Sequence, residues 1–128
     1  MILGLGFDLV EIARVERLLA NKGNRALERL FSPNEVAYAM ARARPAMHLA
    51  ARLAAKEAVF KALTGTDDAR LIGWREAEVV PRDGHGPLLH LTGRAETRAA
   101  ELGVRRVLLT LSHTDTTAGA VVILSAGE

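Results

Sequence analysis

The spacing of apolar residues differs between segments of the chain, and each spacing predicts a different element. Residues Ile2–Asp8 form a short apolar run with two glycines, which is typical of a buried strand. Apolar residues then recur at positions 12, 15, 18 and 19 of Ile12–Asn21, the spacing of one helical face. The chain therefore begins with a strand followed directly by an amphipathic helix.

Two further helices are predicted before the middle of the chain. The sequence Ser-Pro-Asn-Glu at 32–35 places an N-cap serine, a proline at the first helical position and a glutamate at the third, which together predict a capping box and a helix over 33–43. Pro45 interrupts this pattern. Residues 47–64 are then almost all good helix formers, and Gly65 is placed as a C-terminal stop.

The second half of the chain changes to the period of strands. Asp-Gly at 83–84 marks a turn between two strands, Gly103 ends a short helix, and two β-branched runs flank a His-Thr-Asp-Thr turn. The elements predicted here are strands over 74–80 and 87–92, a helix over 94–102, and strands over 107–112 and 117–124. This order predicts an α+β fold, with a mainly antiparallel sheet and the N-terminal helices packed on it.

The amino-acid composition restricts the classes of protein to which the chain can belong. A chain of 128 residues with 49% hydrophobic residues can bury roughly two thirds of its unfolded surface, so we expect residues 1–128 to form a single domain. The absence of cysteine excludes thiol catalysis and iron–sulfur clusters. Asp8 and Glu11 interrupt the first apolar segment, and the uncharged runs fall short of the roughly 20 residues of a membrane helix. We expect a cytoplasmic protein without membrane contact.

The charge of the chain is uneven. Residues 1–64 carry 10 basic and 6 acidic side chains, a net +4, whereas residues 65–128 carry 7 and 9, a net −2. This asymmetry predicts an anionic partner at the N-terminal half. Five aromatic residues are too few for the stacking platforms of single-stranded nucleic-acid binders. A phosphorylated small molecule or an acidic protein is therefore favoured over nucleic acid.

Two carboxylates stand where they could share a metal ion. Asp8 ends the first strand, and Glu57 lies on the helix over 47–64. Together they could hold Mg²⁺, which takes a few carboxylates plus phosphate oxygens and water as ligands. Arg52, Lys56 and Lys61 lie on the helix that carries Glu57 and could contact a phosphate. Alternatively, Asp8 caps the next helix, and Glu57 and Lys61 form an ordinary i, i+4 surface pair.

The sequence Ser-His-Thr-Asp at 112–115 holds the three residue types of a catalytic triad. Adjacent residues cannot supply the geometry of a triad, which draws its members from distant segments. His113 is therefore either a hairpin residue or a ligand contact, and spacing alone favours the former.

Taken together, these motifs resemble one family, the holo-acyl-carrier-protein synthases, which are the small bacterial 4′-phosphopantetheinyl transferases. The matching segments follow the family's order and span nearly the whole chain. They are Gly4–Ile12, Phe31-Ser32 with Glu35, Arg52–Ala58 followed by Lys61–Leu63, Gly86-Pro87 and Leu111–Thr114. The chain departs from the family's pattern at 82–87, which is basic where the family usually has an Asn-Asp-containing loop.

The resemblance implies a fold and a reaction. The fold would be that of the 4′-phosphopantetheinyl transferases. The 4′-phosphopantetheine arm of coenzyme A would pass to a serine of an apo acyl-carrier protein, with Mg²⁺ bound and adenosine 3′,5′-bisphosphate released. Asp8 and Glu57 match the family's Mg²⁺ ligands, and Lys61 matches the lysine beside the pyrophosphate. Arg52 and His113 match positions that line the coenzyme site.

The resemblance also implies an assembly, since the family places the His side of its cleft on a neighbouring subunit of a homotrimer. Glu57 is the best candidate for the base, directly or through a metal-bound water. For the carrier protein, which presents an acidic helix, the candidate contacts are Arg14, Arg17 and Lys22, and Arg14 matches a family contact position.

Two other functions are compatible with the residues alone. A non-catalytic binding module could use the basic helix to capture an acidic helix and would show no magnesium dependence. A nucleotide hydrolase could use the same Mg²⁺ and phosphate groups with water as the nucleophile, and it would turn over coenzyme A without a carrier protein.

Overall fold

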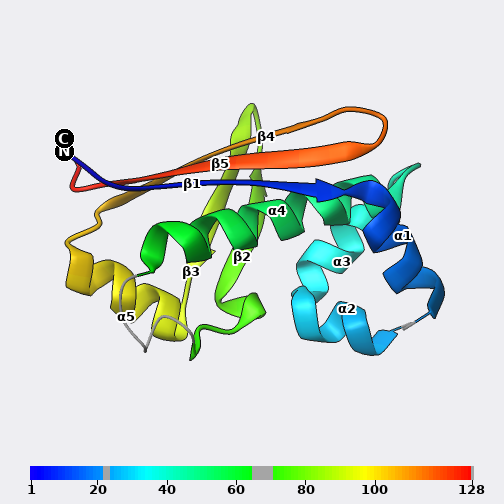
Figure 1. Cartoon of the computed structure of the whole chain (residues 1–128), viewed down its shortest axis with the longest axis horizontal. Helices are drawn as coiled ribbons and strands as arrows, with labels where there is room; N and C mark the ends of the chain where they lie inside the picture. Colours follow the sequence, from blue (N-terminus) through cyan, green and yellow to red (C-terminus); the bar gives the residue numbers. More distant parts are fainter. Residues whose placement is uncertain (22–23, 65–70, 128) are drawn as a thin grey trace.

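The computed structural model describes residues 1–21, 24–64 and 71–127, and Figure 1 shows the arrangement of its elements. Lys22 and Gly65 lie outside the described residues. The elements in chain order are β1 (Ile2–Glu11), α1 (Ile12–Asn21), α2 (Asn24–Leu30), α3 (Pro33–Met40), α4 (Pro45–Leu63), the 3₁₀ turn η2 (Trp74–Glu76), β2 (Ala77–Arg82), β3 (His85–Leu91), α5 (Gly93–Leu102), β4 (Arg106–His113) and β5 (Thr117–Ser125).

Helix α4 is the centre of the molecule. It lies beneath the three-stranded sheet, with α1 and α3 at one end and α5 near the other (Figure 1). Most of its side chains are buried, including Leu49, Leu53 and Val59. Because α4 is covered on several sides, its sequence lacks the broad polar face of a surface helix.

The sheet has the strand order β1-β5-β4, and all its strands are antiparallel. The first strand of the chain thus pairs with the last one, and Asp8 stands opposite Ala120. Strands β2 and β3 form a separate two-stranded antiparallel sheet. The predicted α+β class with antiparallel pairing is confirmed.

Gly6 allows β1 to lie directly on α4. A Cβ atom at Gly6 would stand 1.8 Å from the carbonyl oxygen of Ala58, a distance that no side chain tolerates. Gly4 is similar, because its Cβ would lie 2.9 Å from the carbonyl oxygen of Ala62. This close approach places the strand end that carries Asp8 against the helix.

Several predicted boundaries were wrong. The first strand runs on to Glu11, and the helix predicted over 33–43 ends at Met40. There the Ala41 N–H donates to the carbonyl oxygen of Ala37, and the Arg42 N–H donates to that of Ala39. Helix α4 begins at Pro45 rather than after it, since proline has no N–H to leave unpaired in the first turn. Helix α2 and the turn η2 were missed, because both are too short for periodicity to reveal.

The outer face of the three-stranded sheet exposes large apolar side chains. Leu5 is 65% exposed, Phe7 58% and Leu9 59% on β1, and Leu108 is 41% exposed on β4. These four residues are called the open sheet face below. None of the helices among the described residues is long and apolar enough to cross a membrane.

Candidate active site

Three of the residues singled out in the sequence meet where β1 crosses α4. Lys61 Nζ lies 2.6 Å from Asp8 Oδ1 and also donates to the carbonyl oxygen of Phe7 at 3.3 Å. Glu57 lies one helical turn before Lys61 and pairs with Arg14 of α1, Nη1 to Oε1 at 3.5 Å. Lys61 thus pairs with Asp8 across the fold, which argues against an ordinary i, i+4 surface pair with Glu57. Asp8, Glu57 and Lys61 are called the acidic cluster below.

The two carboxyl groups of this cluster influence each other. The pKa of Glu57 is raised to about 7, first by burial and then by the neighbouring Asp8 carboxylate. Burial alone would raise the pKa of Asp8, but the neighbouring Glu57 carboxyl group and the Lys61 ammonium group outweigh it, and the Asp8 pKa falls. Without a cation, Glu57 therefore gains and loses its proton near neutral pH beside an ionised Asp8.

The acidic cluster fits a divalent metal ion. Asp8 Oδ2 is buried and has no hydrogen-bond partner among the described residues. A cation between Asp8 and Glu57 would supply that partner and relieve the repulsion between the two carboxylates. Within the described ranges no group of three or more His, Cys, Asp or Glu side chains gathers at one point, so the other ligands would be phosphate oxygens and water.

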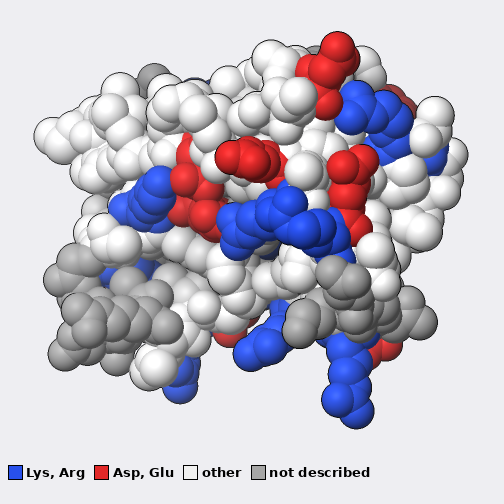
Figure 2. Space-filling view, turned by 45° about the vertical axis from the view of Figure 1, so that its right-hand side comes forward, with Lys and Arg blue, Asp and Glu red and all other residues white. Residues whose placement is uncertain are grey.

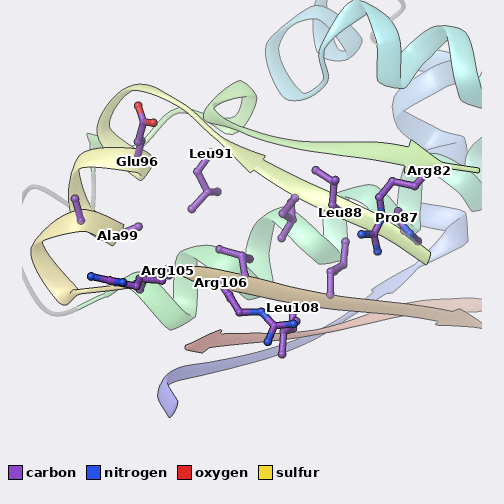
Figure 3. Close-up of a pocket in the computed structure, with 14 residues that line it drawn as sticks. Arg82, Pro87, Leu88, Leu91, Glu96, Ala99, Arg105, Arg106 and Leu108 are labelled. Atoms are coloured by element: carbon purple, nitrogen blue, oxygen red, sulfur yellow. The ribbon is translucent and has the colours of Figure 1, made fainter. Parts of the chain in front are cut away.

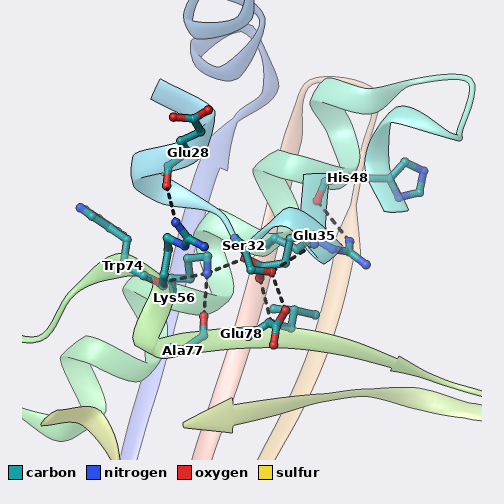
Figure 4. A network of polar contacts seen from close by, with 11 residues as sticks. Glu28, Ser32, Glu35, His48, Lys56, Trp74, Ala77 and Glu78 are labelled. Carbon is teal, nitrogen blue, oxygen red and sulfur yellow. Dashed lines mark hydrogen bonds and ion pairs between the residues drawn. The ribbon is translucent and has the colours of Figure 1, made fainter. Parts of the chain in front are cut away.

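Lys56 does not belong to this cluster, and its sequence-based assignment to the cofactor needs correction. Its side chain is fully buried, with Nζ 2.8 Å from Glu35 Oε1, and it donates to the carbonyl oxygens of Trp74 at 3.0 Å and Ala77 at 2.6 Å (Figure 4). An ammonium group has three hydrogens, and all three are used here. Lys56 has none left for a phosphate.

Glu35 completes this buried network. Its Oε1 also accepts from the backbone of Ser32 at 2.9 Å, which is half of the predicted capping box, and its Oε2 accepts from the Val79 N–H at 2.8 Å. The network therefore ties α3, α4 and β2 together. The sequence indicated the capping box but gave no signal that Glu35 and Lys56 would pair.

Arg52 and His113 line a second site, a pocket of about 230 Å³. Arg52 is only 4% exposed, donates to the carbonyl oxygen of His48 at 3.2 Å, and leaves its Nε without a partner in the described structure. The residues around the pocket come from α3, α4, the β2–β3 turn and the end of β4. Its polar lining is Tyr38, His48, Arg52, Arg82, His85, Ser112 and His113. This group is called the Arg52 pocket below.

Sequence reasoning missed Tyr38, Arg82 and His85 as members of this pocket. The basic character of residues 82–87 was the available signal for the two loop residues. Tyr38 gave no signal, because a lone tyrosine on a helix is ordinarily a packing residue.

The acidic cluster and the Arg52 pocket lie on different faces of α4. Arg52 and Glu57 are five residues apart, which turns their side chains about 140° around the helix axis. None of the three residues of the acidic cluster lines the Arg52 pocket. Within one chain, the two sites are therefore separate.

A third cavity, of about 590 Å³, lies between β3, α5 and β4 and contains none of the predicted site residues (Figure 3). Leucines form much of its wall, and Arg82, Arg105 and Arg106 stand around it. Glu96 is the one acidic side chain among the described residues that line it, and its wall includes neither Asp8 nor Arg52, which carry the unpartnered buried polar atoms of the described structure.

Arg14 and Arg17 are both exposed on α1, while Lys22 lies outside the described residues. The face at this end of the molecule carries basic side chains lying directly against acidic ones (Figure 2). Arg14 is part of that mixture, because its guanidinium group points to Glu57. The predicted docking helix therefore also touches the acidic cluster.

Residues 4–120 match the family model of the 4′-phosphopantetheinyl transferase superfamily. The chain belongs to this family. The transferase is 51% identical to the holo-[acyl-carrier-protein] synthase of Thermus thermophilus over 126 residues, which are 98% of this chain and 95% of that protein. It is 50% identical to the synthase of Anaeromyxobacter dehalogenans over 127 residues, 97% of this chain and 96% of that one.

Solved structures agree with this membership. The Neisseria meningitidis holo-[acyl-carrier-protein] synthase superposes on the transferase with a TM-score of 0.84 at 28% identity, covering 98% of this chain and 99% of that one. The Bacillus anthracis synthase in complex with CoA (3′,5′-ADP) superposes with a TM-score of 0.77 at 30% identity, covering 99% of both chains. The fold expected from the resemblance is confirmed.

Proposed function

We propose that this chain transfers the 4′-phosphopantetheine arm of coenzyme A to a serine of an apo acyl-carrier protein. The serine oxygen bonds to the pantetheine-side phosphorus of the pyrophosphate. The bond from that phosphorus to the bridging oxygen breaks, and adenosine 3′,5′-bisphosphate leaves. The observation that carries this proposal is the Asp8–Glu57 pair with Lys61 beside it, in a chain of this family.

Asp8 and Glu57 would hold Mg²⁺ in this site. When bound, the ion neutralises the charge of the pyrophosphate. Lys61 places a cation next to Asp8, where it can contact a phosphate oxygen as well. Asp8 in turn fixes the position of the Lys61 ammonium group with a 2.6 Å contact.

Glu57 is the proposed base that takes the serine proton. Its pKa is raised to about 7 in the metal-free pair, and a cation held by Asp8 and Glu57 would favour the ionised form of Glu57, which is the form that accepts a proton. Arg14 contacts the same carboxylate at 3.5 Å and thereby holds it beside α1. A carrier protein docked on α1 would bring its serine close to Glu57. The serine comes from the partner, so the chain needs no nucleophile of its own.

We further propose that the active site forms between subunits of a homotrimer. Two observations support this assembly: the open sheet face exposes four large apolar side chains, and the Arg52 pocket faces away from the acidic cluster of its own chain. In the trimer, Arg52 and His113 of one subunit would receive the coenzyme whose pyrophosphate lies at the acidic cluster of the next.

The carrier protein is proposed to dock on α1 through Arg14, Arg17 and Lys22. The exposed guanidinium groups on this helix complement an acidic helix and raise the rate of association. We also propose that residues 1–128 act as one domain, since one cluster of buried apolar residues joins the helices and both sheets. The absence of cysteine fits a reducing compartment, and we propose the cytoplasm.

The test is incubation with coenzyme A, Mg²⁺ and an apo acyl-carrier protein, followed by intact-mass measurement of the carrier. We expect a gain equal to one phosphopantetheine arm, no gain for a carrier whose serine is replaced by alanine, and no gain in EDTA. Turnover of coenzyme A without any carrier would instead support the hydrolase. Carrier binding without transfer or metal dependence would support the binding module.

A further inference from the structure

Tyr38 on α3 lies between two arginine side chains. The guanidinium carbon of Arg42 stands 3.3 Å from the centre of the Tyr38 ring, and that of Arg52 stands 4.0 Å from it. Two planar groups this close to one ring centre cannot share a face, because stacked atoms need about 3.5 Å between them. The Tyr38 ring is therefore enclosed by one guanidinium group on each face.

The surroundings of Arg52 make this contact important. Arg52 is nearly fully buried. Within the described part of the chain, its one hydrogen bond goes to the carbonyl oxygen of His48, and its Nε has no partner. A buried guanidinium group with few hydrogen bonds is costly, and an aromatic face is one of the few other contacts that stabilise it. None of the described residues that line the Arg52 pocket is acidic. The Tyr38 ring thus takes the place of a counter-ion without neutralising the positive charge.

The ring of Tyr38 is itself held in place. His48 meets it edge-on, with ring centres 5.7 Å apart, and Arg42 Nη1 donates to the carbonyl oxygen of Tyr38 at 2.6 Å. Tyr38 and His48 also line the pocket. These contacts join α3 to the first turns of α4 and pack the side chains of Arg52, Tyr38 and His48 against one another.

We infer that Tyr38 is a positioning residue for the coenzyme, acting by stacking on Arg52 so that its free N–H groups remain directed at a phosphate-bearing ligand in the pocket. This inference rests on the proposed function, which places the adenosine 3′,5′-bisphosphate part of coenzyme A at Arg52 and His113. A carboxylate in the place of Tyr38 would hold Arg52 equally well but would repel the phosphate. An aromatic ring orients the cation and leaves its charge for the ligand.

The test compares Tyr38→Leu with Tyr38→Phe. Calorimetry with adenosine 3′,5′-bisphosphate gives binding without any transfer step, and steady-state kinetics gives KM for coenzyme A and kcat. For Tyr38→Leu we expect the Kd and the KM for coenzyme A to rise about five- to tenfold, while kcat and the KM for carrier protein stay within twofold. Tyr38→Phe keeps the ring, and both constants should stay within twofold of the wild type.

Val36→Ala on the same helix is the matched structural control. Val36 is half-buried and lies away from the Arg52 pocket, so this variant should lower the melting temperature without changing coenzyme binding. If Tyr38→Leu does not fold, Tyr38→Met takes its place, since methionine keeps the volume without an aromatic face. Equal binding constants for the folded leucine or methionine variant and the wild type would overturn the inference.

A double-mutant cycle separates this inference from the proposed function. Arg52→Gln should weaken binding of adenosine 3′,5′-bisphosphate, and adding Tyr38→Leu should then weaken it no further. If Tyr38→Leu costs the same factor in the Arg52→Gln background, Tyr38 does not act through Arg52. If Arg52→Gln alone leaves binding unchanged, the proposed coenzyme site is wrong and the inference falls with it.

Discussion

Helix α4 carries two lysines in very similar ion pairs, and they have different roles. Lys56 lies 2.8 Å from Glu35, and Lys61 lies 2.6 Å from Asp8. In the first region every hydrogen of the ammonium group and both carboxylate oxygens are hydrogen-bonded inside the protein. In the second region one oxygen of Asp8 is left without a partner among the described residues, and the neighbouring Glu57 has a raised pKa of about 7.

The difference teaches how a structural ion pair can be distinguished from a functional one. Distance does not separate the two regions, but hydrogen-bond satisfaction does. A buried network whose polar atoms are all paired rigidifies the fold and has nothing to offer a ligand. A cluster that keeps an unpaired carboxylate oxygen can still gain a partner, and a metal ion can supply it.

The largest effect is expected from the acidic cluster. Asp8→Asn and Glu57→Gln each remove a negative charge with little change of shape, and we expect transfer to fall by at least about a thousandfold, which corresponds to about 4 kcal/mol. Circular dichroism and thermal melting should show an intact fold. A Glu57→Gln enzyme with a near wild-type rate at saturating Mg²⁺ would refute the assignment.

Substitutions in the buried Lys56–Glu35 pair should lower stability rather than act directly on transfer. Lys56→Met leaves the Glu35 carboxylate buried without its cation, and breaking a buried pair costs roughly 3–5 kcal/mol of unfolding free energy. Replacing both partners, with Glu35→Leu and Lys56→Met together, should recover part of that loss. Denaturant unfolding measures both variants. A single mutant as stable as the wild type but unable to bind coenzyme A would show that Lys56 belongs to the site after all.

In the proposed trimer, the open sheet face lies between subunits, and the Arg52 pocket of one subunit meets the acidic cluster of the next. Leu5→Glu places a charge on the β1 surface that is 65% exposed in the single chain, and it should convert trimers to monomers with loss of transfer. Sedimentation equilibrium of the wild type and the variant measures this directly. A wild-type monomer at micromolar concentration that transfers at full rate would exclude the shared site.

The acidic cluster should also make stability depend on pH in the absence of metal. The Glu57 pKa is raised from 4.5 to about 7 in the folded state, so the folded protein binds more protons than the unfolded one between these values. Its stability should therefore fall as pH rises from about 4.5 to about 7 and level off above that, by a total on the order of 3 kcal/mol.

Urea unfolding across this pH range, with and without Mg²⁺, measures the effect. Added Mg²⁺ should restore the stability at pH 8, and Glu57→Gln should flatten the profile because it has no titrating carboxyl group at that position. Glu35→Gln is the control, since it should lower stability across the range without removing the slope. A Glu57→Gln profile with the wild-type slope would assign the proton to another group.

The smallest effect concerns the docking helix. Arg17→Glu reverses a charge that is exposed on α1, and we expect the KM for carrier protein to rise about three- to tenfold at low salt. The difference should shrink at high salt, and coenzyme A binding should not change. Arg14→Glu is a poorer test, because Arg14 contacts Glu57 and its reversal also perturbs the acidic cluster. A normal KM for Arg17→Glu at low salt would place the docking surface elsewhere.

The sequence by itself determined the elements whose signals are local. The capping box at Ser32, the glycine stop after α5, and the alternating strands around the turn at 113–116 all act within a few residues. The sequence also singled out Asp8, Glu57 and Lys61, because a strand-end acid and a helix carrying Glu and Lys are residue types suited to Mg²⁺ and phosphate, and because they match a family's motif. Short elements without caps or clear periodicity, such as α2, could not be predicted from the sequence.

Only the tertiary structure decided which partner each charged side chain of α4 takes. Lys56 and Lys61 are both plausible phosphate ligands in sequence, yet their acidic partners lie 21 and 53 residues away, on α3 and β1. Burial then gives the two lysines different roles. The fully enclosed ammonium group of Lys56 must be completely hydrogen-bonded inside the protein, whereas the exposed one of Lys61 keeps hydrogens for a ligand. The stacking of Arg52 on Tyr38 has the same origin, since it depends on how α3 packs against α4.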